Sequence, residues 1–175
     1  MKLSSLSLAS QVSLYNKVLL YRAEVKEFLS KLTSEDFNVV IGGSFCLVCK
    51  FPEFHDREIS DIDLIVVGTP TAVKDIQSGL NMLRRLGSLP TNEGSSDEAI
   101  VFGYIYTPWE LKTEILFRGV DYISFRKDGR LFENPENILK VKREWVAKHV
   151  NKHIEPRIKD VEDIKILEDL LELPF

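Results

Sequence analysis

The sequence is poor in cysteine, has no long apolar run and contains no repeated or low-complexity segment. Its two cysteines, Cys46 and Cys49, exclude a disulfide-stapled scaffold and suit a reducing cytoplasm. Because no apolar run approaches the ~20 residues that cross a bilayer, we expect no membrane-spanning helix. The Ser-rich segment Met1–Ser13 lacks the apolar core and the cleavage site of a signal peptide, so we expect a cytoplasmic location.

The remaining composition is that of an ordinary folded protein, but its charge is unevenly distributed. The chain has 175 residues, of which 44% are hydrophobic and 29% are charged, and this is enough to bury one core. The net charge of −4 argues against a protein that coats DNA. Residues 140–159, however, hold seven cations against two carboxylates, a local charge of +5. Such a basic strip beside an acidic centre suits a metal-dependent enzyme that acts on a polyphosphate, although a solvated helix face is the simpler explanation of the strip alone.

Hydrophobic periodicity and turn residues predict helices and strands along the whole chain. The expected helices cover residues 11–32, 44–50, 70–86, 134–149 and 156–171. The expected strands cover residues 37–41, 61–67, 99–107, 111–118 and 120–126, with a hairpin at Gly119 between the last two. This order predicts an α+β or mixed α/β fold, in which helices flank a mixed sheet and two helices follow at the C-terminal end. We expect a single domain over residues 1–175, with a core over about 37–126 and a helical part over about 134–172.

The strand expected over residues 61–67 begins with two aspartates, Asp61 and Asp63. Residues two apart on a strand project to the same face, so both carboxylates point together while Ile62 and Leu64 fill the other face. Adjacent carboxylates at the mouth of a buried strand repel each other unless a cation lies between them, and Mg²⁺ takes such oxygen ligands. An Asp-x-Asp pair alone is weak support, because solvated strand ends and metal-dependent glycosyltransferases also carry one.

Two further segments strengthen a phosphate-and-metal interpretation. Gly42-Gly43-Ser44 ends one strand and opens a helix, where free backbone N–H groups and a serine hydroxyl suit an anion. A plain strand-to-helix turn with Ser44 as its N-cap explains this segment equally well. Lys112 and Glu114 share one face of the strand expected over residues 111–118. If that strand lies beside Asp61, Glu114 supplies a third carboxylate and Lys112 becomes a phosphate or ion-pair partner.

These segments, in this order, resemble the DNA polymerase β-like nucleotidyltransferase superfamily. The matching motifs are Gly42-Gly43-Ser44, Arg57-x-x-Ser60-Asp61-Ile62-Asp63 and Lys112-x-Glu114. Lys159-Asp160-x-x-Asp163 looks like the Lys-Asp-x-x-Asp helix of the abortive-infection-type toxin members of that superfamily. The resemblance implies that Asp61, Asp63 and Glu114 are catalytic and bind two Mg²⁺ ions, with Mn²⁺ as an alternative. It also implies a nucleotide-binding set that comprises Gly43, Ser44, Arg57, Lys112, Lys159, Asp160 and Asp163.

The activity implied by this resemblance is the transfer of an NMP from an NTP to a hydroxyl acceptor, with release of pyrophosphate. The basic strip favours RNA, tRNA included, as the acceptor, and a protein is the alternative. A toxin or phage-defence role, with a cognate antitoxin or another partner protein, is the biological expectation that accompanies this family. Two other classes stay open: a non-catalytic binding or antitoxin-like module with the same fold, and a metal-dependent glycosyltransferase, for which the chain is small.

Other candidate motifs have simpler explanations. Cys46 and Cys49, with His55 downstream, have the spacing of a redox or zinc half-site, but a structural zinc site needs a second ligand pair. The apolar residues between the two thiols favour a role in the core. Trp109 and Trp145 are expected to be core or interface anchors rather than platforms for base stacking.

Overall fold

The computed structural model describes residues 1–90, 99–107, 109–118 and 131–171. The strand expected over 120–126 and the hairpin expected at Gly119 lie outside the described residues. Contacts within the chain divide it into two compact units, Met1–Phe132 and Glu133–Phe175, and each is considered by itself. The second unit begins one residue before the helical part expected from residue 134. The first unit also includes residues 1–36, which the expected core leaves out.

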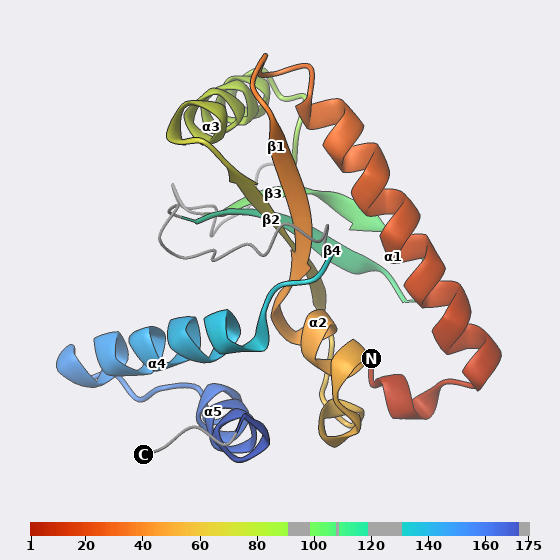
Figure 1. Cartoon of the computed structure of the whole chain (residues 1–175), viewed down its shortest axis with the longest axis vertical. Coiled ribbons are helices and arrows are strands. Elements are labelled where there is room, and N and C mark those ends of the chain that lie inside the picture. Colours follow the sequence, from red (N-terminus) through yellow and green to blue (C-terminus); the bar gives the residue numbers. More distant parts are fainter. Residues whose placement is uncertain (91–98, 108, 119–130, 172–175) are drawn as a thin grey trace. The chain divides into compact units, whose positions relative to one another are not determined.

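The first unit combines a mixed four-stranded sheet with helices, and the second is a pair of helices (Figure 1). This confirms the expected mixed α+β fold. The first unit contains η1 (Leu3–Ser5), α1 (Leu8–Leu29), β1 (Phe37–Gly42), α2 (Gly43–Lys50), η2 (Pro52–Phe54), β2 (Asp61–Gly68), α3 (Pro70–Arg85), β3 (Ala99–Ile105) and β4 (Leu111–Phe117). The second contains α4 (Pro135–Asn151) and α5 (Ile158–Leu170). In the described part of the chain, every helix is too short or too polar to cross a bilayer.

The sheet has the strand order β1-β2-β4-β3. β2 is antiparallel to β1 and parallel to β4, and β3 is antiparallel to β4. A parallel pair needs a crossover connection, which α3 and β3 supply between β2 and β4. In this register Asp63 is opposite Gly42 of β1 and opposite Glu114 of β4. One face of the sheet packs around Val40, Ile65 and Leu116.

The long helix α1 covers the face of the sheet opposite to Asp63. The Arg22 side chain of α1 donates hydrogen bonds to the Val39 carbonyl at 2.5 Å and to Asn38 at 2.6 Å. The Tyr21 hydroxyl of α1 lies close to Gly103, because a Cβ added to Gly103 would be only 3.0 Å from that oxygen. Since Gly103 is paired with Thr113, and Thr113 with Ile62, α1 lies on the face that carries Ile62. Figure 1 shows α1 running alongside the strands.

Several helix ends differ from the sequence-based boundaries because of local hydrogen bonds. The helix expected over 11–32 is α1, which begins three residues earlier because the Ser7 side chain caps it by accepting from the Ser10 N–H. It ends at Leu29, where the following N–H groups of residues 31 and 32 bond to carbonyls three residues back. The Thr69 side chain caps α3 by accepting from the Ala72 N–H, and Asn134 caps α4 ahead of a proline at its first position.

The segment 51–60, between the helix expected over 44–50 and the strand expected over 61–67, is neither purely polar nor purely a loop. It contains the short helix η2, and the side chains of Phe54 and Ile59 are each 1% exposed. The Ser4 N–H donates to the His55 carbonyl at 3.0 Å, so the N-terminal segment packs along this stretch. Two isolated apolar residues in a charged segment carry no periodic signal, and only tertiary contacts bury them.

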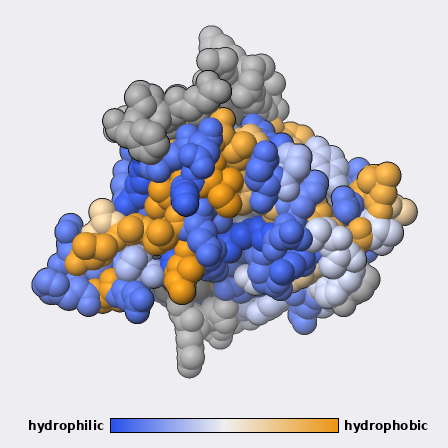
Figure 2. Space-filling model, turned by 90° about the horizontal axis from the view of Figure 1, so that it is seen from below, coloured by the Kyte–Doolittle hydropathy of each residue, from blue (hydrophilic) through white to orange (hydrophobic). Residues whose placement is uncertain are grey.

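Exposed apolar side chains form separate patches among hydrophilic ones on the face seen in Figure 2. The most exposed large apolar side chains of the described residues are Leu8, Tyr106, Leu86 and Ile158. Scattered apolar side chains of this kind are normal on protein surfaces and identify no docking face.

Candidate functional site

Three carboxylates converge on one face of the sheet. Asp61 and Asp63 come from β2 and Glu114 from β4, and one carboxylate oxygen of each lies within 4.8 Å of the others. The register explains this arrangement, because Asp63 is opposite Glu114 in the parallel β2–β4 ladder. Side chains at paired positions of neighbouring strands share a face. The structure therefore brings together the three residues that the sequence singled out from two distant segments.

Gly43 lies directly against the Asp63 carboxylate. Its backbone has φ +61°, in the left-handed region that favours glycine. A Cβ at this position would be 1.9 Å from Asp63 Oδ2 and 2.9 Å from its Cγ. Glycine is thus required both by the backbone conformation and by the close approach of the carboxylate. The turn between β1 and α2 and the acidic cluster form one continuous site.

The N-terminus of α2 opens at this site. Its N-cap residue is Gly42, which has no side chain with which to cap the helix. The interpretation of Ser44 as a simple N-cap is therefore wrong, because Ser44 lies in the first helical turn, where it is half-buried. Backbone N–H groups and the helix dipole at such an end favour an anion.

Lys112 makes an ion pair inside the acidic cluster. Its Nζ lies 2.6 Å from Glu114 Oε1, and the two side chains are 33% and 23% exposed. The hydrogen bond to Glu114 raises the pKa of Lys112, and the charges of Glu114, Asp61 and Asp63 act in the same direction against the lowering caused by partial burial. The lysine is thus held as an ammonium. Of the two roles that the sequence suggested, this structure displays the ion-pair role.

Tyr104 faces the same side of the sheet as the site, whereas Arg57 is placed only by the loop that leads to β2. A β-bulge at Phe102 shifts the β3 register so that Tyr104 is opposite Lys112 and shares its face of the sheet. Arg57 lies half-buried in the loop before β2, where its backbone N–H donates to the Phe54 carbonyl at 2.9 Å. The bulge has no clear signal in the sequence beyond Gly103, so the sequence left the direction of Tyr104 open.

The donor set fits a hard divalent cation. All three candidate ligands are carboxylates, they are half-buried, and oxygen ligands of this kind suit Mg²⁺ or Mn²⁺. Within the described parts of the chain, this is the only group of three or more potential metal ligands.

The cysteines do not form a second metal site of this kind. Cys46 is fully buried, and burial raises the pKa of the Cys49 thiol to about 12, so it stays protonated. This agrees with a core role for the pair. Cys49 and His55 line a mostly apolar cavity of about 220 Å³, together with residues of α1 and α2 such as Tyr15 and Phe45. None of the three carboxylates lines that cavity.

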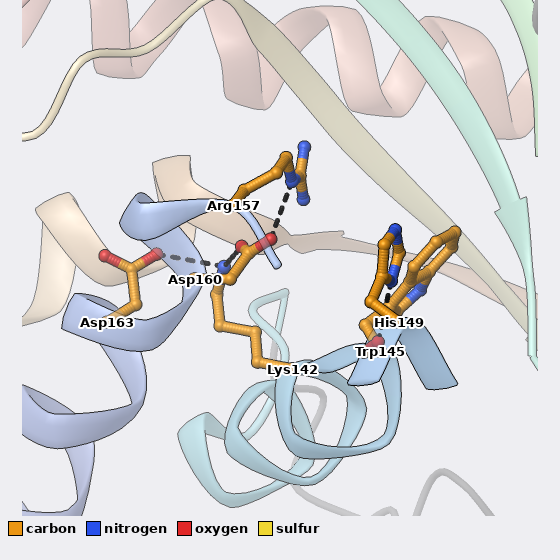
Figure 3. A network of polar contacts seen from close by, with 6 residues as sticks. All are labelled: Lys142, Trp145, His149, Arg157, Asp160 and Asp163. Atoms are coloured by element: carbon orange, nitrogen blue, oxygen red, sulfur yellow. Dashed lines mark hydrogen bonds and ion pairs between the residues drawn. The ribbon is translucent and has the colours of Figure 1, made fainter. Parts of the chain in front are cut away.

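In the second unit, the aspartates of the Lys-Asp-x-x-Asp segment connect α5 to α4 (Figure 3). Asp160 and Asp163 are 4% and 2% exposed, and the Lys142 ammonium lies 2.7 Å from the first and 2.9 Å from the second. Burial alone would raise the pKa of Asp160, but the hydrogen bonds and charges of Lys142 and Arg157 outweigh it and lower that pKa. Lys159, by contrast, is exposed. The contribution of these residues to nucleotide binding stays a prediction.

The basic strip at 140–159 is less cationic than its sequence indicates. Lys142 and Arg157 pair with Asp160, and Arg143 pairs with Glu168 at 2.5 Å. The four remaining cations are exposed: Lys140, Lys148, Lys152 and Lys159.

An aromatic side chain accompanies these exposed lysines. Trp145 is 46% exposed, which excludes the core position but leaves the expected interface role as a prediction. Its ring lies 5.2 Å from the His149 ring, and the Lys148 ammonium lies 5.5 Å from its centre. Figure 3 shows Trp145 and His149 side by side on α4. The helix therefore presents an aromatic and cationic surface in place of a uniformly charged one.

No protein-family model matches the sequence, and neither a curated protein nor a solved structure matches the chain.

Proposed function

We propose that this protein is a metal-dependent nucleotidyltransferase, which moves an NMP from an NTP to a hydroxyl acceptor and releases pyrophosphate. One observation carries the proposal: the carboxylate oxygens of Asp61, Asp63 and Glu114 lie within 4.8 Å of one another, and the helix-opening turn at Gly43 touches that cluster. The reaction needs ligands for divalent cations and donors for a triphosphate, and this site offers both. Two free thiols support a cytoplasmic location as part of the proposal.

The residues of the site divide the work of the reaction. Bound divalent cations would stabilise the phosphate charges and activate the acceptor hydroxyl. Asp61 and Asp63 would hold the cations, and the first turn of α2 would bind the triphosphate through its N–H groups and Ser44. Glu114 would complete the cation site and would accept the proton of the acceptor hydroxyl. The acceptor oxygen bonds to the α-phosphorus, the bond from that phosphorus to the bridging oxygen breaks, and pyrophosphate leaves.

RNA is the acceptor that we favour over protein. The exposed lysines of α4 and the loop after it offer contacts for phosphates, and Trp145 offers a ring on which an unpaired base can stack. Lys159 and Arg57 are proposed to contact the triphosphate, on the sequence resemblance alone. A toxin or phage-defence role, with an antitoxin as partner, also depends on that resemblance alone.

The proposal is tested by nucleotide binding and by transfer of label. Calorimetry with each NTP and Mg²⁺ measures binding, and incubation with α-labelled NTP and total RNA or total protein measures transfer. We expect Asp63→Asn to abolish transfer, and Glu53→Gln, which changes an exposed carboxylate in η2, to leave it intact. Binding of an NTP without transfer to any acceptor would favour the non-catalytic module. Transfer of sugar from a nucleotide sugar would favour the glycosyltransferase.

A further inference from the structure

The ammonium of Lys112 makes an ion pair with Glu114, a carboxylate that the proposed reaction needs for binding a cation. Lys112 and Glu114 are two residues apart on β4, so their side chains share a face and the ion pair forms within a single strand. At 2.6 Å between Nζ and Oε1, the contact is a charge-assisted hydrogen bond. The charges of Asp61 and Asp63 act on the same ammonium. The Lys112 ammonium is therefore a positive charge that the protein itself supplies to the acidic cluster.

We propose that Lys112 is an internal competitor for the divalent cation at Glu114. In the absence of metal the ammonium holds Glu114 and offsets part of the repulsion among the three carboxylates. When a divalent cation binds Glu114, the ammonium must leave, because the two like charges would otherwise share one carboxylate. This inference rests on the proposed function, since it takes the acidic cluster as a cation site.

The side chain of Lys112 is able to make this exchange. It is one-third exposed, and its flexible four-carbon stem lets the ammonium move without a change in the backbone. The triphosphate supplies the alternative partner, because the helix-opening turn that would bind it touches Asp63 in the same cluster. Lys112 thus weakens cation binding at Glu114 until a nucleotide binds and the ammonium pairs with its triphosphate instead.

The first experiment measures Mn²⁺ binding to the nucleotide-free protein by calorimetry. We expect Lys112→Met to bind Mn²⁺ about two- to fivefold more tightly than the wild type, the range for loss of a partly exposed ion pair. Lys74→Met is the matched control, because Lys74 is exposed on α3, which contributes no residue to the acidic cluster. Its affinity for Mn²⁺ should equal that of the wild type. Circular dichroism verifies that both variants are folded.

A double-mutant cycle tests whether Lys112 acts through Glu114. In a Glu114→Gln background the ion pair is already lost and only the charges of Asp61 and Asp63 still act on the ammonium, so adding Lys112→Met should tighten Mn²⁺ binding less than it does with Glu114 present. An equal gain in both backgrounds would show a general effect of charge and would overturn the inference, as would an unchanged affinity of Lys112→Met. In either case the wild type would still bind Mn²⁺ and the proposed function would stand. If no variant with an intact triad binds Mn²⁺, the proposed function itself fails, and the inference with it.

Discussion

The close contact between Gly43 and Asp63 makes Gly43→Ala an informative substitution. The backbone at this residue has φ +61°, and a side chain there costs about 1–2 kcal/mol of stability. The new Cβ would also lie 1.9 Å from Asp63 Oδ2, whereas real Cβ contacts are essentially never shorter than 3.0 Å. The Asp63 carboxylate or the start of α2 must therefore move by about 1 Å.

This displacement should affect the site much more than it affects the fold. A misplacement of ~1 Å in a catalytic arrangement costs about a hundredfold in rate. We therefore expect Gly43→Ala to transfer label about a hundredfold more slowly and to bind Mn²⁺ more weakly. For a chain of this size, the backbone cost lowers the melting temperature by only about 2–8 °C.

Gly87 provides the matched control. It has φ +74°, so Gly87→Ala meets the same kind of backbone cost, but its Cβ would meet no atom within 4 Å. Both variants should melt a few degrees below the wild type, and only Gly43→Ala should lose Mn²⁺ affinity and transfer, as measured by calorimetry and label incorporation. Equal Mn²⁺ affinity in the two variants would refute the idea that the turn positions the Asp63 carboxylate.

Three further predictions concern buried polar groups. Lys142→Met leaves Asp160 and Asp163 without their shared ammonium and should lower the free energy of unfolding of the helix pair by about 3–5 kcal/mol, whereas the exposed Lys140→Met should change it by less than about 0.5 kcal/mol. Equal denaturation midpoints for these two variants would contradict that. Because the pKa of Asp160 is held below its ordinary value of 3.8, this carboxyl adds stability above that value, which is lost as the pH falls through the lowered pKa. Melting curves between pH 7 and pH 3 should therefore show a smaller acid-induced loss in Asp160→Asn than in the wild type, and an identical loss would count against the ion pair. Burial raises the pKa of Cys49 from 9.0 to about 12, so between these values the thiol ionises in the unfolded chain but not in the folded protein. The free energy of unfolding should therefore be unaffected by this thiol below pH 9 and should fall as the pH rises toward 12. The folded protein should resist iodoacetamide at about pH 8.5, and alkylation of Cys49 at the rate of the unfolded chain would show that the thiol is accessible.

Local signals in the sequence were sufficient to place most elements. The strand expected over 61–67 is β2, Asp61–Gly68, and the helix expected over 70–86 is α3, Pro70–Arg85, because strand alternation and helix periodicity involve only residues close together in the chain. Boundaries failed where a signal was weak. The strand expected over 99–107 ends at Ile105, and the helix expected over 11–32 is shifted because the sequence contains several serines that could cap it.

The sequence by itself determined that Asp61 and Asp63 share a face, and that Lys112 and Glu114 share one, because the period of a strand is two residues. It could not determine that these two faces meet. That required β4 to pair with β2 in the parallel register that sets Glu114 opposite Asp63, and a one-residue shift would have turned Glu114 to the other face.

The tertiary structure likewise decided which polar residues are buried. Nucleotide binding by Asp160 and Asp163 is implied by the resemblance alone and stays a prediction, whereas the structure shows that both residues are buried and pair with Lys142 from another helix. The sequence alone cannot reveal this, because strand register and helix packing depend on contacts between residues far apart in the chain, whereas periodicity, capping and turn formation depend on residues within a few positions of one another.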